Sequence, residues 1–258
     1  MNSQALNECF IAAMTRRCRY VPGSIVDDSA GLATLFTNMS LPSSYCVVSS
    51  PPRSREDFAA RVRRAIDYGS RSHTPWSLVV LDDWLADGHG EIVEVHGLER
   101  HATVHGMWTA ELSAPRRPAP SIDFRRVSNA NELRQLGAIN NLAHGFRPET
   151  GLVIYDHYVD APDSHAFVGY VGDEAVTCAA AFPVAHGIYL GGVATIERHR
   201  GHGYGEAASR HALNAAREHT PDVPFILFAD RRRAAFHEPL GFRSDAQLEL
   251  YRFPNQRR

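Results

Sequence analysis

Apolar residues recur at helical spacing in residues 131–143, which read NELRQLGAINNLA. Its larger apolar side chains stand three or four positions apart, so they fall on one face of a helix. Ser128 and Asn129 come just before this stretch, and either side chain is a typical helix N-cap. The pattern therefore predicts a helix here.

Three apolar stretches follow this helix, and their length and residue types are typical of strands. Gly172-Asp173 and His186-Gly187 separate the stretches and are typical turn sequences. Because both connections are short, we expect neighbouring strands to run antiparallel, as a meander. The predicted strands are His165–Val171, Ala175–Val184 and Ile188–Thr195.

The rest of the C-terminal part alternates between helix and strand. A glycine-rich turn follows Thr195, and the next helix is expected to end near His219, before a proline. A strand at Phe225–Ala229, a short helix after Asp230 and a last strand at Ala246–Phe253 complete the pattern. This order predicts an α/β fold with a mixed α+β sheet.

The N-terminal part has a weaker version of the same pattern. Ser54–Tyr68 begins with a variant capping box and predicts a helix, and Pro75–Leu81 predicts a strand. Ser113–Pro120 reads SAPRRPAP, and its three prolines without apolar periodicity indicate a linker. We expect two related copies, a degenerate domain at residues 1–112 and a complete domain at residues 121–258, with the linker at 113–120 between them.

The composition is that of an ordinary soluble globular protein. Of its 258 residues, 44% are hydrophobic and 22% are charged, and the formal net charge is -2 at pH 7. This balance gives no reason to expect a nucleic acid or a membrane as a partner. Because the chain has neither a secretory signal pattern nor a run of about 18 apolar residues, we expect a cytoplasmic protein.

The four cysteines and fourteen histidines do not form a metal-binding pattern. The chain has no CxxC pair, no HExxH motif and no His/Cys spacing suited to zinc. We therefore expect reduced cysteines and no metal site.

The stretch VATIERHRGHGYGEAA, residues 193–208, has the features of an anion-binding turn. The first N–H groups of a helix lack partners within the helix, and the helix dipole makes this end partly positive. Gly201, Gly203 and Gly205 leave peptide amides uncovered and permit positive φ, and Arg200 adds a fixed cation. A phosphate group suits this arrangement, although a glycine-rich surface turn without a ligand is the simpler alternative.

Two common phosphate motifs fit this turn poorly. A P-loop requires GxxxxGK[ST], and the chain contains no lysine. A dinucleotide fingerprint, GxGxxG/A, counted from Gly201 places Glu206 at its third small position. Asp230 ends the next strand, where such a domain has its ribose-binding acid, so a nicotinamide oxidoreductase is left open as an alternative.

A third motif, [Q/R]xxGx[G/A], is matched by Arg200, Gly203 and Gly205. Here the sequence resembles the pyrophosphate loop of the GNAT superfamily of acyl-CoA N-acyltransferases. A second stretch, LFADRRRAAFHEPLGF at residues 227–242, resembles the later motif of that family, which typically ends in a tyrosine, two variable residues and Leu-Gly-Phe. Tandem members with a degenerate first copy are known in the family. Two positions depart from its pattern: Glu197 stands where members often have proline, and His237 where they commonly have the tyrosine.

The resemblance implies a GNAT-like fold and an N-acetyltransferase that moves the acetyl group of acetyl-CoA directly to a primary amine, expected to belong to a small molecule. In the family, the glycine loop binds the diphosphate of coenzyme A, and the strand before it pairs with the pantetheine arm. His237 is carried over as the catalytic acid that protonates the departing thiolate. The positions carried over to coenzyme binding are Val193, Ala194, Thr195, Arg200, Gly201, His202, Gly203, Tyr204 and Gly205.

Three aspects of function are left open by the sequence. Tyr189, His186, Asp156 and His157 are candidates for the general base, and a chain of water molecules is another. No motif identifies the amine acceptor, and a homodimer stays open. Because the usual tyrosine is missing and the first copy is degenerate, a coenzyme-binding or regulatory module without turnover is the alternative function.

Overall fold

The structure is a computed structural model that describes residues 1–37, 44–72, 74–86, 88–150, 155–156 and 161–254. Its residues form two compact units. The first unit comprises Met1–Met107, Phe228–Ala234 and Ser244–Arg258, and the second comprises Trp108–Leu227 and Ala235–Arg243. The expected domain boundaries at 1–112, 113–120 and 121–258 stay a prediction. The last strand of the chain belongs to the same unit as the N-terminal part.

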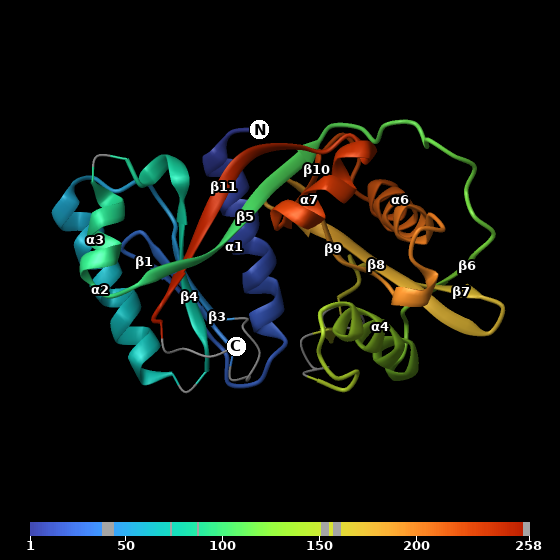
Figure 1. Ribbon diagram of the computed structural model, residues 1–258, viewed down its shortest axis with the longest axis horizontal. Coiled ribbons are helices and arrows are strands. Elements are labelled where there is room, and N and C mark those ends of the chain that lie inside the picture. The colour runs from blue at the N-terminus through green and yellow to red at the C-terminus, as the bar shows by residue number, and fades with distance from the viewer. Residues whose placement is uncertain (38–43, 73, 87, 151–154, 157–160, 255–258) are drawn as a thin grey trace. The chain divides into compact units, whose positions relative to one another are not determined.

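The strands of the first unit follow the order β1-β2-β3-β4-β11-β5. β1, β2 and β3 form an antiparallel meander, β4 lies parallel to β3, and β11 lies antiparallel to β4. Figure 1 shows α1 on one face of these strands and α2 with α3 on the other. The elements are α1 (Ser3–Arg19), β1 (Ile25–Ser29), β2 (Leu32–Phe36), β3 (Ser44–Val48), α2 (Arg55–Arg71), β4 (Trp76–Leu81), the 3-10 helix η1 (Asp82–Trp84), α3 (His89–Val95), β5 (Glu99–Thr109) and β11 (Arg243–Arg252).

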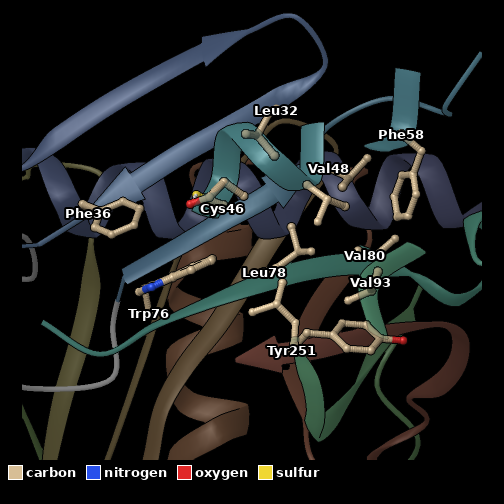
Figure 2. Close-up of a cluster of buried hydrophobic side chains, with 13 residues drawn as sticks. Leu32, Phe36, Cys46, Val48, Phe58, Trp76, Leu78, Val80, Val93 and Tyr251 are labelled. Atoms are coloured by element: carbon tan, nitrogen blue, oxygen red, sulfur yellow. Dashed lines mark hydrogen bonds between the residues drawn. The ribbon is translucent and has the colours of Figure 1, made fainter. Parts of the chain in front are cut away.

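The core of the first unit lies between these strands and α2 (Figure 2). Phe58 of α2 and Leu78 of β4 are fully buried in it. Tyr251 of β11 belongs to the same cluster and lies opposite Leu78 in the β4–β11 register. Because burying one large apolar side chain is worth about 1.5–3 kcal/mol, the C-terminal strand is part of what stabilises the first unit.

The helix predicted at Ser54–Tyr68 is confirmed as α2, and its N-cap is Ser54 as expected. The Ser54 side chain accepts a hydrogen bond from the Asp57 N–H at 3.2 Å, which satisfies one of the free amides of the first turn. The Asp57 carboxylate in turn accepts from the Arg53 N–H at 2.9 Å. Together they form a variant of the capping box, in which Asp57 replaces the usual glutamate and bonds the N–H of the residue before the N-cap.

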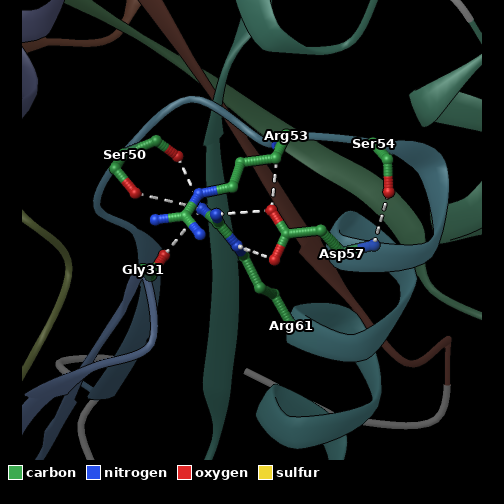
Figure 3. Close-up of polar contacts among 6 residues, drawn as sticks. All are labelled: Gly31, Ser50, Arg53, Ser54, Asp57 and Arg61. Carbon is green, nitrogen blue, oxygen red and sulfur yellow. Dashed lines mark hydrogen bonds and ion pairs between the residues drawn. The ribbon is translucent and has the colours of Figure 1, made fainter.

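A buried arginine links this cap to the neighbouring strands (Figure 3). Arg61, which is 5% exposed, pairs with Asp57 at 2.6 Å and donates to the carbonyl oxygens of Ser50 at 2.6 Å and Gly31 at 3.1 Å. The Arg53 N–H, together with the Arg61 guanidinium, holds the pKa of Asp57 below its usual range. The Arg61 side chain thus holds the capping residue Asp57 and donates to two backbone carbonyls at the same time.

The strands of the second unit follow the order β10-β9-β8-β7-β6. β6, β7, β8 and β9 run antiparallel in turn, so the predicted meander is confirmed, and β10 lies parallel to β9. Figure 1 shows α4 on one face of this sheet and α6 on the other. The elements are β6 (Asp123–Arg126), α4 (Ala130–Ala143), β7 (His165–Val171), β8 (Glu174–Val184), β9 (Gly187–Thr195), the 3-10 helix η3 (Glu197–His199), α6 (Tyr204–Arg217), β10 (Phe225–Ala229), α7 (Arg231–His237) and the 3-10 helix η4 (Glu238–Leu240), and the end of β10 and the start of α7 lie in the first unit.

The helix predicted at residues 131–143 is confirmed as α4. Asn129 is its N-cap and accepts from the N–H groups of Asn131 at 3.0 Å and Glu132 at 3.1 Å. The Glu132 carboxylate accepts from the N–H of Ser128 at 2.7 Å. Both predicted capping residues therefore take part in the start of the helix.

Small side chains let α6 lie close to the sheet, as the alanine-rich sequence predicted. Ala208, Ala212 and Ala216 are buried, and α6 packs against β7, β8 and β9. α6 is also the crossover that joins β9 to its parallel neighbour β10, which places the start of the helix beside the end of β9. None of the described helices combines the length and apolar character needed to cross a bilayer.

Replacing Arg61 with methionine should destabilise the first unit by about 3 kcal/mol, because Asp57 and the carbonyls of Gly31 and Ser50 lose their buried donor. Unfolding in urea, followed by circular dichroism, measures the change. Arg63, which is exposed on the same helix, provides the matched control, and Arg63→Met should change stability by less than about 0.5 kcal/mol. Equal stability of the two variants would contradict the structural role of Arg61.

Candidate functional site

The predicted anion-binding turn lies between the end of β9 and the start of α6. Gly201 and Gly203 both have φ of +84°, a left-handed conformation that favours glycine. A Cβ added at Gly201 would meet nothing within 4 Å, and one at Gly203 would meet only Pro120, at 3.9 Å. The turn therefore needs glycine for its backbone conformation and leaves peptide surface uncovered.

The first helical amides of α6 are available to a ligand. Within the described part of the chain, no hydrogen-bond acceptor is found for the N–H groups of Tyr204, Gly205 and Glu206. The first backbone bond of the helix joins the N–H of Ala207 to the Gly203 carbonyl at 3.0 Å, and Gly203 has no side chain to cap the helix. These amides and the helix dipole favour an anion at this position.

The charged side chains around the turn leave it positive. The Arg200 Nε donates to the Thr195 carbonyl at 3.1 Å, which ties this arginine to the end of β9. Arg117 donates to the Gly201 carbonyl at 3.4 Å. The carboxylate of Glu206 is paired with Arg210 at 2.8 Å, whereas no described carboxylate pairs with Arg200 or Arg117. The turn therefore lies beside two cations without a described counter-charge.

The side chains of His202 and Tyr204 brace the turn. The His202 Nδ1 lies 3.0 Å from the Arg200 carbonyl and donates to it, and its ring stacks on the Tyr204 ring with centroids 5.8 Å apart. Both rings therefore contact the backbone or each other within the turn. Their predicted role in holding the coenzyme stays a prediction.

A β-bulge interrupts β9 just before this turn. In the β8–β9 register Cys178 lies opposite Ala194 and Ala180 lies opposite Gly191, so Gly192 and Val193 together face Ala179. Gly192 has φ of +60°, as expected for the glycine of a bulge. Sequence reasoning missed this bulge. The signal was the Gly-Gly pair within a predicted strand, because glycine weakens a regular strand and often marks a bulge.

β9 also separates from its parallel neighbour at this place. Its pairing with β10 covers Ile188 and Tyr189, opposite Phe225 and Ile226, and β9 then continues to Thr195. The predicted binding residues Val193, Ala194 and Thr195 therefore lie beyond the paired part of the two strands. Such a separation exposes strand backbone groups to a ligand.

The second sequence motif reaches the same turn. A Cβ at Gly205 would lie 3.3 Å from both the Phe236 ring and the Thr195 hydroxyl, so a side chain at this position would require one of these neighbours to move. Phe236 precedes His237, and their rings contact each other edge to face at 4.8 Å. The fold therefore brings the segment around His237 next to the start of α6.

His237 is buried, with 7% of its surface exposed. Its Nδ1 has no hydrogen-bond partner among the described residues, which is uncommon for a buried polar atom. Burial lowers the pKa of His237 to about 4, because the charged ring loses its hydration. The ring is therefore neutral near pH 7, not the imidazolium that the predicted acid role assumed. That role stays a prediction.

The candidates for the general base differ in burial. Tyr189 is buried on β9 with its ring against Phe182, at a centroid distance of 5.1 Å. His186 is exposed in the turn between β8 and β9, and His157 lies outside the described residues. No group of three His, Cys, Asp or Glu side chains in the described part is placed to bind a metal, and all four cysteines are buried and in the reduced thiol form.

Comparison with known proteins finds one family model that matches part of the chain. Residues 133–242 match the model of the acetyltransferase (GNAT) family. In fold the chain is similar to a GCN5-related N-acetyltransferase from Kribbella flavida, with a TM-score of 0.75, 17% identity and coverage of 99% of this chain and 97% of that chain. It is also similar to a tandem GNAT protein from the clavulanic acid biosynthesis pathway, with a TM-score of 0.58, 14% identity and coverage of 96% and 93%. No curated protein sequence matches the chain.

These findings confirm the resemblance seen in the two motifs and the mixed α/β fold that it implied. A further structural relative, a GCN5-related N-acetyltransferase from Sphaerobacter thermophilus, has a TM-score of 0.61 and 16% identity, and covers 86% of this chain and 76% of that chain. At such identities the structural similarities show the fold alone. Two related copies stay a prediction, which the meander, helix and parallel strand found in each unit support.

Burial of His237 should make the protein less stable in acid. The pKa of its ring is about 4 in the folded chain and near 6.5 when unfolded, so its contribution is complete above pH 6.5 and is lost as the pH falls toward 4. Between pH 7.5 and pH 4.5 this loss is about 2–3 kcal/mol. Urea unfolding at both pH values measures the free energy of unfolding. Its decrease between pH 7.5 and pH 4.5 should be smaller by this amount in His237→Gln than in wild type. Parallel losses in the two proteins would exclude the shifted pKa.

Proposed function

Because residues 133–242 match the model of the acetyltransferase (GNAT) family, we propose that this chain transfers the acetyl group of acetyl-CoA directly to a primary amine of a small molecule. The observation that carries the proposal is the glycine turn, where the first amides of α6 have no described acceptor and Arg200 lies beside them. A diphosphate is an anion of suitable size and charge for this position.

The residues of the turn fit the diphosphate of the coenzyme. Gly201 and Gly203 have no Cβ to block the approach, and an added Cβ at Gly201 would stand in open space. The amides of Tyr204 and Gly205 supply donors, and Arg200 supplies charge. We assign the diphosphate to residues 200–205 on these grounds.

The end of β9 fits the pantetheine arm and the thioester. Val193 and Thr195 lie past the paired part of β9 and β10, so their backbone groups can pair with the amide groups of the arm. The bulge turns the backbone at Gly192, next to the Val193 and Ala194 amides. An amide held in this way can stabilise the negative oxygen that develops on the thioester carbonyl.

Acetyl-CoA supplies an activated acyl group as a thioester. The amine nitrogen attacks the carbonyl carbon, a C–N bond forms, and the C–S bond breaks with its electron pair going to sulfur. The nitrogen loses a proton and the sulfur gains one. His237, buried and neutral, can donate a hydrogen bond to the sulfur, and negative charge developing on sulfur would raise the pKa of the ring.

Turnover is tested by release of coenzyme A thiol from acetyl-CoA in the presence of a panel of small primary amines. The wild-type chain should release thiol with at least one amine of the panel. His237→Ala should lower turnover about 10²-fold, the lower end for a positioned proton donor, and His237→Tyr should preserve it. Full turnover by His237→Ala would remove the acid role of this residue.

A coenzyme-binding module without turnover is the second candidate. The pKa of His237, lowered by burial to about 4, favours this alternative, because no imidazolium is present at neutral pH. Binding of acetyl-CoA by the wild-type chain, without thiol release for any amine of the panel, would support the module instead of the enzyme.

Replacing Gly203 with valine should weaken acetyl-CoA binding at least about 100-fold, because a branched side chain would cover the amides at the start of α6. Calorimetry measures the affinity. Gly145→Val is the matched control, since Gly145 has φ of +77° and nothing within 4 Å of an added Cβ but lies at the end of α4. The two variants incur similar backbone strain, so equal affinities would contradict the assignment of the diphosphate to this turn.

A further inference from the structure

Two neighbouring side chains of β8 hold the bulged part of β9 by hydrogen bonds to its carbonyls. The Thr177 hydroxyl donates to the Ala194 carbonyl at 2.7 Å, and the Cys178 thiol donates to the Gly192 carbonyl at 3.1 Å. Both side chains are fully buried, with no exposed surface. Hydrogen bonds from buried side chains to strand carbonyls are additional to those of the β8–β9 pairing and fix the peptide groups that they contact.

The two side chains reach β9 from opposite faces of the sheet. Successive residues of a strand point to opposite faces, so Thr177 and Cys178 lie on different sides of β8. The Thr177 hydroxyl lies 2.9 Å from the hydroxyl of Thr195, which is 3.3 Å from an added Cβ at Gly205 of α6. The Cys178 thiol also lies 3.8 Å from the Leu136 carbonyl of α4. Thr177 therefore holds the end of β9 from the face covered by α6, and Cys178 holds it from the face covered by α4.

These bonds determine where two amides of β9 point. The described peptide bonds are trans, so a carbonyl and the N–H of the next residue point in opposite directions. Because the Gly192 carbonyl points to Cys178, the Val193 N–H points away from β8. Because the Ala194 carbonyl points to Thr177, the Thr195 N–H also points away from β8. Both amides are thus turned toward the edge of β9 where its pairing with β10 has ended.

We propose that Thr177 and Cys178 are positioning residues, which aim the N–H groups of Val193 and Thr195 at the thioester arm of the coenzyme. The proposal rests on the proposed function, which places that arm along β9. Neither side chain touches the coenzyme in this account, because each acts through the carbonyl that it holds. Thr177 and Cys178 therefore add to the site two residues that belong to neither sequence motif.

The bulge explains why side-chain donors are needed at this point. A bulge leaves its extra residue out of the ladder, so the Gly192 peptide has no regular partner to orient it. The thiol supplies that partner and stays protonated at neutral pH, since burial raises the pKa of Cys178 to about 12. A loosely oriented amide would lose the alignment that electrostatic stabilisation of a developing oxyanion requires.

The test compares two ligands on the full chain: acetyl-CoA, and adenosine 3′-phosphate 5′-diphosphate, which carries the diphosphate without the pantetheine arm. Thr177→Val and Cys178→Ala each remove one donor with little change in shape. By calorimetry, each should weaken acetyl-CoA binding about tenfold and change binding of the nucleotide less than twofold. Thr177→Ser, which keeps the hydroxyl, should restore acetyl-CoA binding to within about twofold of wild type.

A matched control separates positioning from loss of stability. Thr34 is a fully buried threonine on β2 of the first unit, and Thr34→Val makes the same chemical change away from β9. Thr34→Val should leave both affinities unchanged, whatever its effect on the melting temperature. If Thr177→Val does not fold, Cys178→Ala carries the test alone.

The amides themselves provide the decisive signal in NMR spectra of protein labelled with ¹⁵N in glycine, valine and threonine. Acetyl-CoA should shift the Gly203 and Gly205 amides in wild type and both variants, and the Val193 and Thr195 amides strongly only in wild type. If acetyl-CoA shifts the Val193 and Thr195 amides of the variants as strongly as those of wild type, with the glycine shifts intact, the positioning role alone is overturned. No glycine shift in wild type would overturn the proposed function and this inference together.

Discussion

The candidate site depends on one constraint of the α-helix, that its first amides find no partner within the helix. At the start of α6 these amides have no capping side chain, because the N-cap residue is Gly203. Gly201 and Gly203 adopt left-handed φ values and leave the backbone uncovered. At the start of α2 the same constraint is resolved internally, by the hydroxyl of Ser54 and the carboxylate of Asp57. One helix is thus closed to an anion, and the other is available to one.

The same contrast explains why the two units can share a chain pattern but differ in chemistry. Each unit has a meander, a helix and a parallel strand, so each places a helix start beside the end of a central strand. In the first unit the connection from β3 to α2 contains Pro51 and Pro52, and Asp57 and Arg61 pair in the helix that follows. In the second unit the connection from β9 to α6 contains glycines instead. Asp57 places a carboxylate in the first turn of α2, the end of a helix that attracts anions, and Arg61 pairs with it.

The sequence predicted the regular elements of the second unit well, because periodicity and turn residues are local signals. The helix at 131–143, the meander and the glycine turn all follow from residues close to one another in the chain. The bulge at Gly192 and the hydrogen bonds from Thr177 and Cys178 depend on the register between two strands, which no local pattern encodes. The low pKa of His237 depends on burial, which results from packing of distant segments, so residue type alone could not predict it.

The placement of β11 in the first unit has a consequence for biosynthesis. Tyr251 and the β4–β11 ladder use residues that are synthesised after the second unit, whereas the other buried residues of that cluster lie between Leu32 and Leu98. Until β11 is synthesised, β4 keeps an unpaired edge, and such edges recruit other chains. The first unit can therefore complete its sheet only after the second unit has been synthesised, and a chain truncated before β11 would leave β4 without this partner.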